Sequence, residues 1–168
     1  MPLITKEQEV KKPSGQFLKI EDKSVVTIYS NLYSTRTHYF EDKKASVICK
    51  GEKCTLCSGD KAITQYYYYG QVGKDEGIVK IPGSVFFAMN EAERVLDISK
   101  RDCTWVISKT GTGIETRYTV TRGKDLAEVP DIEAANEKLE KIMDEQVKQL
   151  TLRYSEFVYE KEPMPEEQ

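Results

Sequence analysis

Much of the chain alternates between short apolar runs and charged or turn residues, which is the pattern of β-strands. Strands are expected within FLKIEDKSVVTIYSNLY (17–33) and KASVICK (44–50). The segments AITQYYYYGQV (62–72) and EGIVKIP (76–82) predict a hairpin, because turn residues separate them. Residues 103–123 predict a second hairpin around the turn KTGTG.

Two segments change to a helical period. In residues 83–99 apolar side chains recur every three or four positions, and Ser84 is expected to cap the helix. A second helix is predicted within residues 131–158, where apolar residues follow one stripe. The first stripe contains Val85, Phe86, Met89, Ala92 and Leu96, and the second contains Ile132, Ala135, Leu139, Ile142, Val147 and Leu150.

The order of these elements predicts a mainly β protein with α-helices. About five principal strands, with a helix before the last hairpin and another after it, fit a five-stranded barrel of the OB type. Other small β-barrels fit the same order. We expect a flexible N-terminal arm at residues 1–15, the barrel domain with an inserted cysteine loop at 16–123, a C-terminal helix at 124–153 and an acidic tail at 154–168.

Composition and charge add two constraints. No apolar run approaches the roughly 20 residues that span a bilayer, and the first 15 residues contain no signal segment, so we expect a cytoplasmic protein with no membrane partner. Residues 1–123 contain 19 Lys and Arg against 15 Asp and Glu, whereas residues 124–168 contain 6 against 13. A mildly basic body is therefore followed by an acidic end.

One segment gathers the residue types that bind transition metals. It contains the only histidine and three of the four cysteines, in the order His-x10-Cys-x4-Cys-x2-Cys. Thiolates with an imidazole suit a tetrahedral ion and favour Zn²⁺ over Mg²⁺ and Ca²⁺, which prefer oxygen ligands. In a reducing compartment, clustered cysteines also favour a metal over disulfides. We predict a zinc site with the ligands His38, Cys49, Cys54 and Cys57.

This zinc is expected to be structural. Four candidate ligands close a tetrahedral shell, and the segment lacks the His-x-Glu and Pro-Cys-x2-Cys motifs of zinc deaminases. Unligated cysteines beside a surface histidine, or a redox-active Cys-x2-Cys pair, are the alternatives, and Asp42 or Asp60 is an alternative ligand to His38. With its only histidine assigned to the metal and no convincing nucleophile pair or carboxylate dyad, the chain is not expected to be an enzyme.

Tyrosines and basic residues surround the cysteine loop. Because alternate side chains of a strand face opposite sides, two of the four residues Tyr66–Tyr69 are expected to face outward. Exposed aromatic rings beside cations form platforms on which unpaired bases stack. The alternative is that tyrosines simply favour strands and the lysines are ordinary surface residues. Trp105, Tyr118 and Cys103 are expected in the core, and the basic residues of the last hairpin have Glu115 as an alternative partner to phosphate. The candidate nucleic-acid contacts are Tyr33, Arg36, Tyr39, Phe40, Lys43, Lys44, Tyr67, Tyr69, Lys109 and Arg117.

The segments HYFEDKKASVICKGEKCTLC (38–57) and DISKRDCTWVISKTGTGIETRYTV (97–120), with a tyrosine-rich strand between them, resemble the single-stranded-DNA-binding proteins of T4-like phages. The resemblance extends over residues 24–123, and its specific part is the ordered His and Cys set, which has different spacers in that family. It implies an OB fold, a structural zinc on this ligand set, and single-stranded DNA held by aromatic and basic residues. It also implies an acidic C-terminal segment that recruits replication or recombination proteins, in a virus-encoded protein acting in the host cytoplasm. The family's cooperative binding through a basic arm is not carried over, because residues 1–15 offer only three lysines.

We therefore expect a non-catalytic protein that binds single-stranded DNA without sequence preference and acts in DNA replication, recombination or repair, with RNA as an alternative ligand. Binding should weaken with salt as counterions are released from the phosphates. The alternative function is a zinc-containing protein-interaction module of a replication or transcription complex, with its tyrosines at a protein interface.

Overall fold

The computed structural model describes residues 17–41, 43–51, 54–58 and 62–161, and the side chains of these residues except 57, 58 and 157–161. The expected N-terminal arm and the end of the acidic tail lie outside the described residues. The chain divides into two compact units. Unit 1 comprises Met1–Tyr33 and Tyr66–Leu139, and unit 2 comprises Ser34–Gln65 and Glu140–Gln168.

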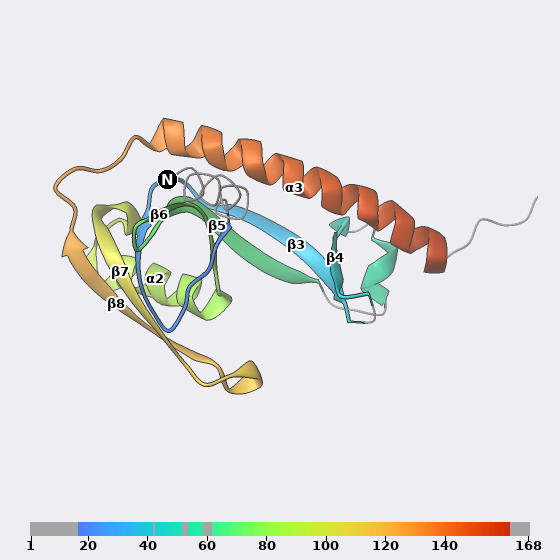
Figure 1. Cartoon of the computed structure of the whole chain (residues 1–168), viewed down its shortest axis with the longest axis horizontal. Coiled ribbons are helices and arrows are strands. Elements are labelled where there is room, and N and C mark those ends of the chain that lie inside the picture. The colour runs from blue at the N-terminus through green and yellow to red at the C-terminus, as the bar shows by residue number, and fades with distance from the viewer. Residues whose placement is uncertain (1–16, 42, 52–53, 59–61, 162–168) are drawn as a thin grey trace, which may run out of the picture. The chain divides into compact units, whose positions relative to one another are not determined.

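The secondary structure is mainly β, with two described α-helices (Figure 1). The helices are α2 (Gly83–Leu96) and α3 (Ile132–Lys161). Short 3₁₀ turns are η3 (Thr55–Ser58), η4 (Lys100–Asp102) and η5 (Gly113–Glu115). The strands are β1 (Phe17–Leu18), β2 (Lys23–Ile28), β3 (Tyr33–Phe40), β4 (Ala45–Ile48), β5 (Ile63–Val72), β6 (Asp75–Ile81), β7 (Cys103–Thr110) and β8 (Arg117–Asp125).

The strands form a mixed sheet in which six of them follow the order β1-β6-β5-β2-β7-β8. Only the β1–β6 pair is parallel along this path; the other pairs are antiparallel. Both predicted hairpins, β5–β6 and β7–β8, are confirmed. Among the described strands no pairing joins β8 to β6 or to β1, so the sheet is open there. The class of mainly β with α is confirmed.

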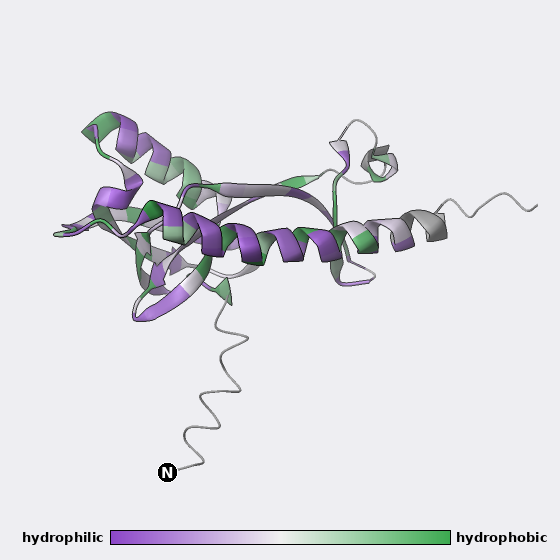
Figure 2. Ribbon diagram, turned by 90° about the horizontal axis from the view of Figure 1, so that it is seen from above, coloured by the Kyte–Doolittle hydropathy of each residue, from purple (hydrophilic) through white to green (hydrophobic). Residues whose placement is uncertain are grey.

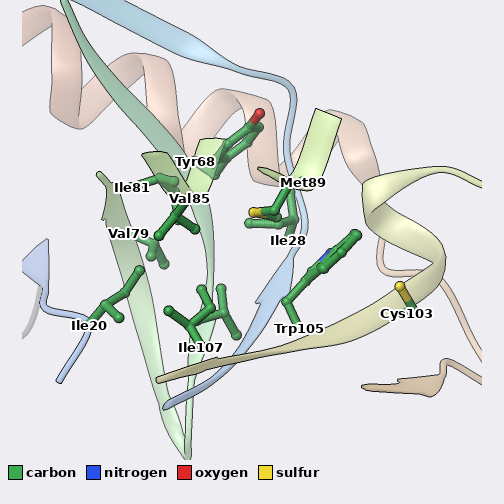
Figure 3. Close-up of a cluster of buried hydrophobic side chains, with 11 residues drawn as sticks. Ile20, Ile28, Tyr68, Val79, Ile81, Val85, Met89, Cys103, Trp105 and Ile107 are labelled. Carbon is green, nitrogen blue, oxygen red and sulfur yellow. The ribbon is translucent and has the colours of Figure 1, made fainter. Parts of the chain in front are cut away.

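The apolar core of unit 1 lies between the sheet and α2, and Figure 3 shows its side chains pointing toward one another. From α2, Val85 and Met89 are fully buried against strand residues. Trp105 is also fully buried, and its indole Nε1 donates to the carbonyl oxygen of Lys100 at 3.0 Å. The predicted core positions of Trp105 and Cys103 are confirmed, and Tyr118 packs partly buried against the same cluster. The full cluster is Ile20, Val26, Ile28, Tyr68, Val79, Ile81, Val85, Met89, Cys103, Trp105 and Ile107.

The sequence located both helices but misplaced their ends. Pro82 occupies the N-cap position of α2 and no side chain caps this end, so the prediction that Ser84 caps the helix is wrong. Pro82 suits this position because it lacks an N–H to be satisfied. The second helix begins at Ile132 and continues to Lys161, three residues beyond the predicted helical segment 131–158 and eight beyond the domain boundary placed at 153. At its start the carboxylate of Asp131 accepts a hydrogen bond from the Glu133 N–H at 3.0 Å.

Most of α3 is hydrophilic, as Figure 2 shows, with apolar residues at helical intervals. Within unit 1 its residues Ala135 and Leu139 are buried, and within unit 2 its residues Met143, Leu150 and Tyr154 are buried. In the described part of the chain no helix combines the length and apolar character needed to cross a bilayer.

Candidate metal site and nucleic-acid surface

The β3–β4 hairpin places two candidate ligands on one face. His38 pairs with Val47 in the antiparallel register, and the Cys49 N–H donates to the Arg36 carbonyl oxygen at 2.8 Å, which extends the ladder beyond β4. Residues that pair across an antiparallel ladder share a face, as do residues two apart on one strand. His38 and Cys49 are therefore diagonal neighbours on the same face.

A turn after this hairpin returns the chain to His38. Gly51 has a φ of +69°, in the left-handed region that favours glycine, and the Cys54 N–H donates to the Gly51 carbonyl oxygen at 3.0 Å. This turn brings the Cys54 Sγ to 3.4 Å from the His38 Nε2. The ligand atoms of His38, Cys49 and Cys54 all lie within 4.8 Å of one another.

These three side chains fit a metal ion. With Zn–S near 2.3 Å and Zn–N near 2.0–2.1 Å, tetrahedral geometry separates sulfur and nitrogen by about 3.5 Å. The 3.4 Å between Cys54 and His38 agrees with that separation. His38 is fully buried and both cysteines are half-buried, so little reorganisation is needed to enclose an ion. The His38–Cys49–Cys54 group can hold a metal.

The predicted fourth ligand, Cys57, lies in η3, but its side chain is outside the described residues. The same holds for the alternative ligands Asp42 and Asp60.

A small apolar cluster in unit 2 supports the ligand loop. Phe40, Val47, Leu56 and Tyr154 are buried together, and Cys54 packs against them. Tyr154 comes from α3, as the helical pattern of residues 131–158 predicts, although the domain boundary at 153 had assigned it to the acidic tail. Tyr154 lies at helical spacing from Leu150, and this apolar stripe is the signal that the helix continues past the boundary at 153.

Two tyrosines proposed as base-stacking platforms are buried in unit 1. Tyr67 and Tyr69 are each only 8% exposed, so the expectation that two tyrosines of Tyr66–Tyr69 face solvent is wrong. The first turns of α3 approach this side of β5, where Lys138 Nζ lies 5.4 Å from the Tyr69 ring centroid. Strand alternation places Tyr67 and Tyr69 on the face of β5 opposite to Tyr66 and Tyr68. This second face is buried as well.

The Tyr69 hydroxyl has a specific partner beneath α3. It donates to the Glu76 carboxylate at 2.7 Å, and the ring lies 6.4 Å from that of Tyr29. Burial, followed by the Glu76 hydrogen bond and charge, raises the pKa of Tyr69 to about 12. Tyr69 therefore stays protonated as a donor at neutral pH, and the adjacent carboxylate would repel a phosphate.

In unit 2 the β3–β4 hairpin presents an aromatic ring with several cations. Tyr39 is 47% exposed, and Arg36, Lys43 and Lys44 are exposed. Phe40 is instead buried in the cluster below the metal ligands, which corrects its assignment as a surface contact. By strand alternation Arg36 lies on the His38 face of β3 and Tyr39 on the opposite face. We call Arg36, Tyr39, Lys43 and Lys44 the exposed hairpin residues.

The remaining candidates belong to unit 1. Tyr33 and Lys109 are half-buried and Arg117 is exposed. The Arg117 NH1 group donates to the carbonyl oxygens of Ile114 and Thr116, at 3.2 and 2.9 Å, and so braces the tip of the β7–β8 hairpin. Among the described residues it forms no ion pair with Glu115, the alternative partner.

Comparison with known proteins adds no relative. The chain matches no family model, no curated protein and no solved structure.

Proposed function

We propose that this protein binds single-stranded DNA without sequence preference, through a hairpin that a structural zinc ion stabilises. The observation that carries the proposal is the β3–β4 hairpin with its possible metal ligands, on which the side chains of Tyr39, Arg36, Lys43 and Lys44 are each exposed. Exposed rings stack on any base, at about 1–3 kcal/mol per base, and cations contact the phosphates. Such a surface binds a strand without reading its sequence.

The order of strands supports an OB-type barrel as the finer description of the fold. The order β6-β5-β2-β7-β8, with α2 between β6 and β7, is that of a five-stranded Greek-key barrel opened along one seam. Loops between the first and second and between the fourth and fifth strands carry oligonucleotide contacts in OB folds. Here the first connection contains the β3–β4 hairpin and the second lies between Lys109 and Arg117.

The zinc in this proposal is held by His38, Cys49, Cys54 and Cys57. Two or three thiolates with an imidazole select Zn²⁺ over oxygen-preferring ions. The ion supplies folding free energy to the loop and no step of catalysis. The acidic end of the chain is proposed to recruit replication or recombination proteins, which places the protein in DNA replication, recombination or repair.

A titration with poly-dT at several salt concentrations tests this function, beside a duplex of equal length. For single strands the slope of log K against log salt changes by about 0.7 per phosphate contact, so the triple change Arg36→Ala, Lys43→Ala and Lys44→Ala should flatten it by about 2. Tyr39→Ala should weaken binding about 5- to 150-fold with an unchanged slope.

Two exposed residues of unit 1 provide matched controls. Phe87→Ala removes an aromatic ring that is 62% exposed on α2, and Lys74→Ala removes an exposed lysine of the β5–β6 turn. Neither change should affect poly-dT binding. Failure of the wild-type protein to bind poly-dT at low salt refutes the function, and equal effects of control and hairpin variants refute the assigned surface.

A further inference from the structure

The last described turns of α3 contact the metal-ligand loop within unit 2. The hydroxyl oxygen of Tyr154 accepts a hydrogen bond from the Thr55 N–H at 3.1 Å, across 99 sequence positions. Thr55 directly follows the ligand Cys54. The side chain of a distant helix therefore reaches the peptide group that adjoins a metal ligand.

Three further contacts hold the same helix segment to the hairpin. The Lys50 Nζ lies 5.3 Å from the centroid of the Tyr154 ring, and the Arg153 NH1 group donates to the Ser46 carbonyl oxygen at 2.8 Å. The Tyr154 ring itself is buried with Phe40, Val47 and Leu56. The contacting residues come from β3, from β4 and from the segment that follows β4. The end of α3 is therefore packed against the metal-ligand loop.

The hydrogen bond constrains the direction of the Cys54 side chain. The N–H of Thr55 and the carbonyl of Cys54 belong to one planar peptide group. Fixing that plane restricts the rotation of Cys54 about its Cα–C bond, and thus the orientation of its Sγ toward His38. Partners that hydrogen-bond metal ligands directly change metal affinity about 10- to 100-fold when removed, and we expect the lower end of this range for a partner that acts through the backbone.

We propose that Tyr154 is a positioning residue of the metal site, so that metal binding and docking of α3 residues 147–156 on the β3–β4 hairpin are coupled. The inference rests on the proposed zinc site and is independent of nucleic-acid binding. Coupling between two equilibria is reciprocal. If docking of the helix strengthens metal binding, then metal binding stabilises the docked helix by the same free energy. The acidic end of the chain is then anchored, at its start, by the metal.

The rate of zinc release from the full-length, zinc-loaded protein tests the first direction, with a chromogenic chelator in excess. Tyr154→Phe keeps the buried ring and removes the acceptor, and it should release zinc about 10-fold faster than the wild type. Tyr154→Ala should be at least as fast. Leu152→Ala, two residues away at a side chain that is 63% exposed, should match the wild type.

Hydrogen exchange tests the reciprocal direction. Chelation should raise exchange of the amides of residues 147–154 at least about 10-fold in the wild type, while the amides of residues 132–139, which belong to unit 1, should be unaffected. The urea midpoint followed by the fluorescence of Trp105 should be equal in wild type and Tyr154→Phe, which distinguishes positioning from general destabilisation.

The outcomes separate this inference from the proposals on which it stands. A wild-type protein that binds no zinc refutes the metal site and the coupling together. Equal rates of zinc release from wild type, Tyr154→Phe and Tyr154→Ala refute the coupling alone. Hydrogen exchange in residues 147–154 that does not change on chelation also refutes it. The result of the poly-dT titration tests neither the metal site nor the coupling.

Discussion

Removal of the metal should unfold the β3–β4 hairpin and leave the core around Trp105 folded. Among the described residues, the apolar cluster around Trp105 in unit 1 and the cluster around Tyr154 in unit 2 have no member in common. The cluster of unit 2 has four buried members, and Met143 and Leu150 are also buried in this unit; at about 1.5–3 kcal/mol each, these six side chains contribute roughly 9–18 kcal/mol. Structural zinc in small domains contributes about 10–16 kcal/mol. A bound zinc ion would thus supply about half of the favourable free energy of unit 2, against net domain stabilities of only about 5–15 kcal/mol.

Two probes report on the units separately. Trp105 is the only tryptophan and is fully buried in unit 1, so its fluorescence during urea unfolding measures that core. Hydrogen exchange of residues 37–48 measures the hairpin of unit 2. After verified metal removal, we expect the hairpin amides to lose protection at least about 100-fold, equivalent to about 2.7 kcal/mol, with an unchanged Trp105 midpoint.

Two results would contradict this reasoning. Retained protection of residues 37–48 in metal-free protein would show that these buried side chains fold the hairpin unaided. A simultaneous collapse of the Trp105 transition would show that the two units unfold as one cooperative structure. A mock treatment with zinc-saturated chelator controls for effects of the chelator itself.

Further predictions concern unit 1 and use the Trp105 urea transition. Met89→Ala should lower the free energy of unfolding by about 2–5 kcal/mol, because Met89 is fully buried; a loss below 1 kcal/mol contradicts the packing. Gly70→Ala should cost about 3 kcal/mol, since its Cβ would meet a backbone oxygen of β2 at 2.1 Å, whereas Gly83→Ala, with its nearest contact at 3.9 Å, should be neutral or stabilising. A tyrosine in the unfolded chain ionises near pH 10, whereas the pKa of Tyr69 in the folded protein is about 12. The contribution of Tyr69 to the free energy of unfolding is therefore complete below pH 10 and is lost as pH rises toward 12. Tyr69→Phe should reduce this alkaline decline by up to about 1.4 kcal/mol per pH unit, and an identical decline in the variant would exclude the role of Tyr69.

Local chemistry was sufficient to predict the grouping of His38, Cys49 and Cys54 and both hairpins. His38, Cys49 and Cys54 lie within 17 residues of one another, so a hairpin and a glycine turn bring them together without a distant partner. The helical periods likewise located α2 and α3, because apolar spacing reflects which side of a helix is buried. Their ends were less predictable, since Pro82 begins α2 where no side-chain cap forms.

Only the tertiary structure decided which aromatic residues are exposed. The alternation of Tyr66–Tyr69 assigns side chains to two faces of β5, but it does not state whether another element covers the outer face, and Tyr67 and Tyr69 are buried. Likewise, Tyr154 reaches Thr55 across 99 positions, beyond any local pattern. Ligand spacing is a property of neighbouring residues and can be read from sequence, whereas burial depends on distant segments. Among the proposed contacts, the tertiary structure therefore favours Arg36, Tyr39, Lys43 and Lys44 over the tyrosines of β5.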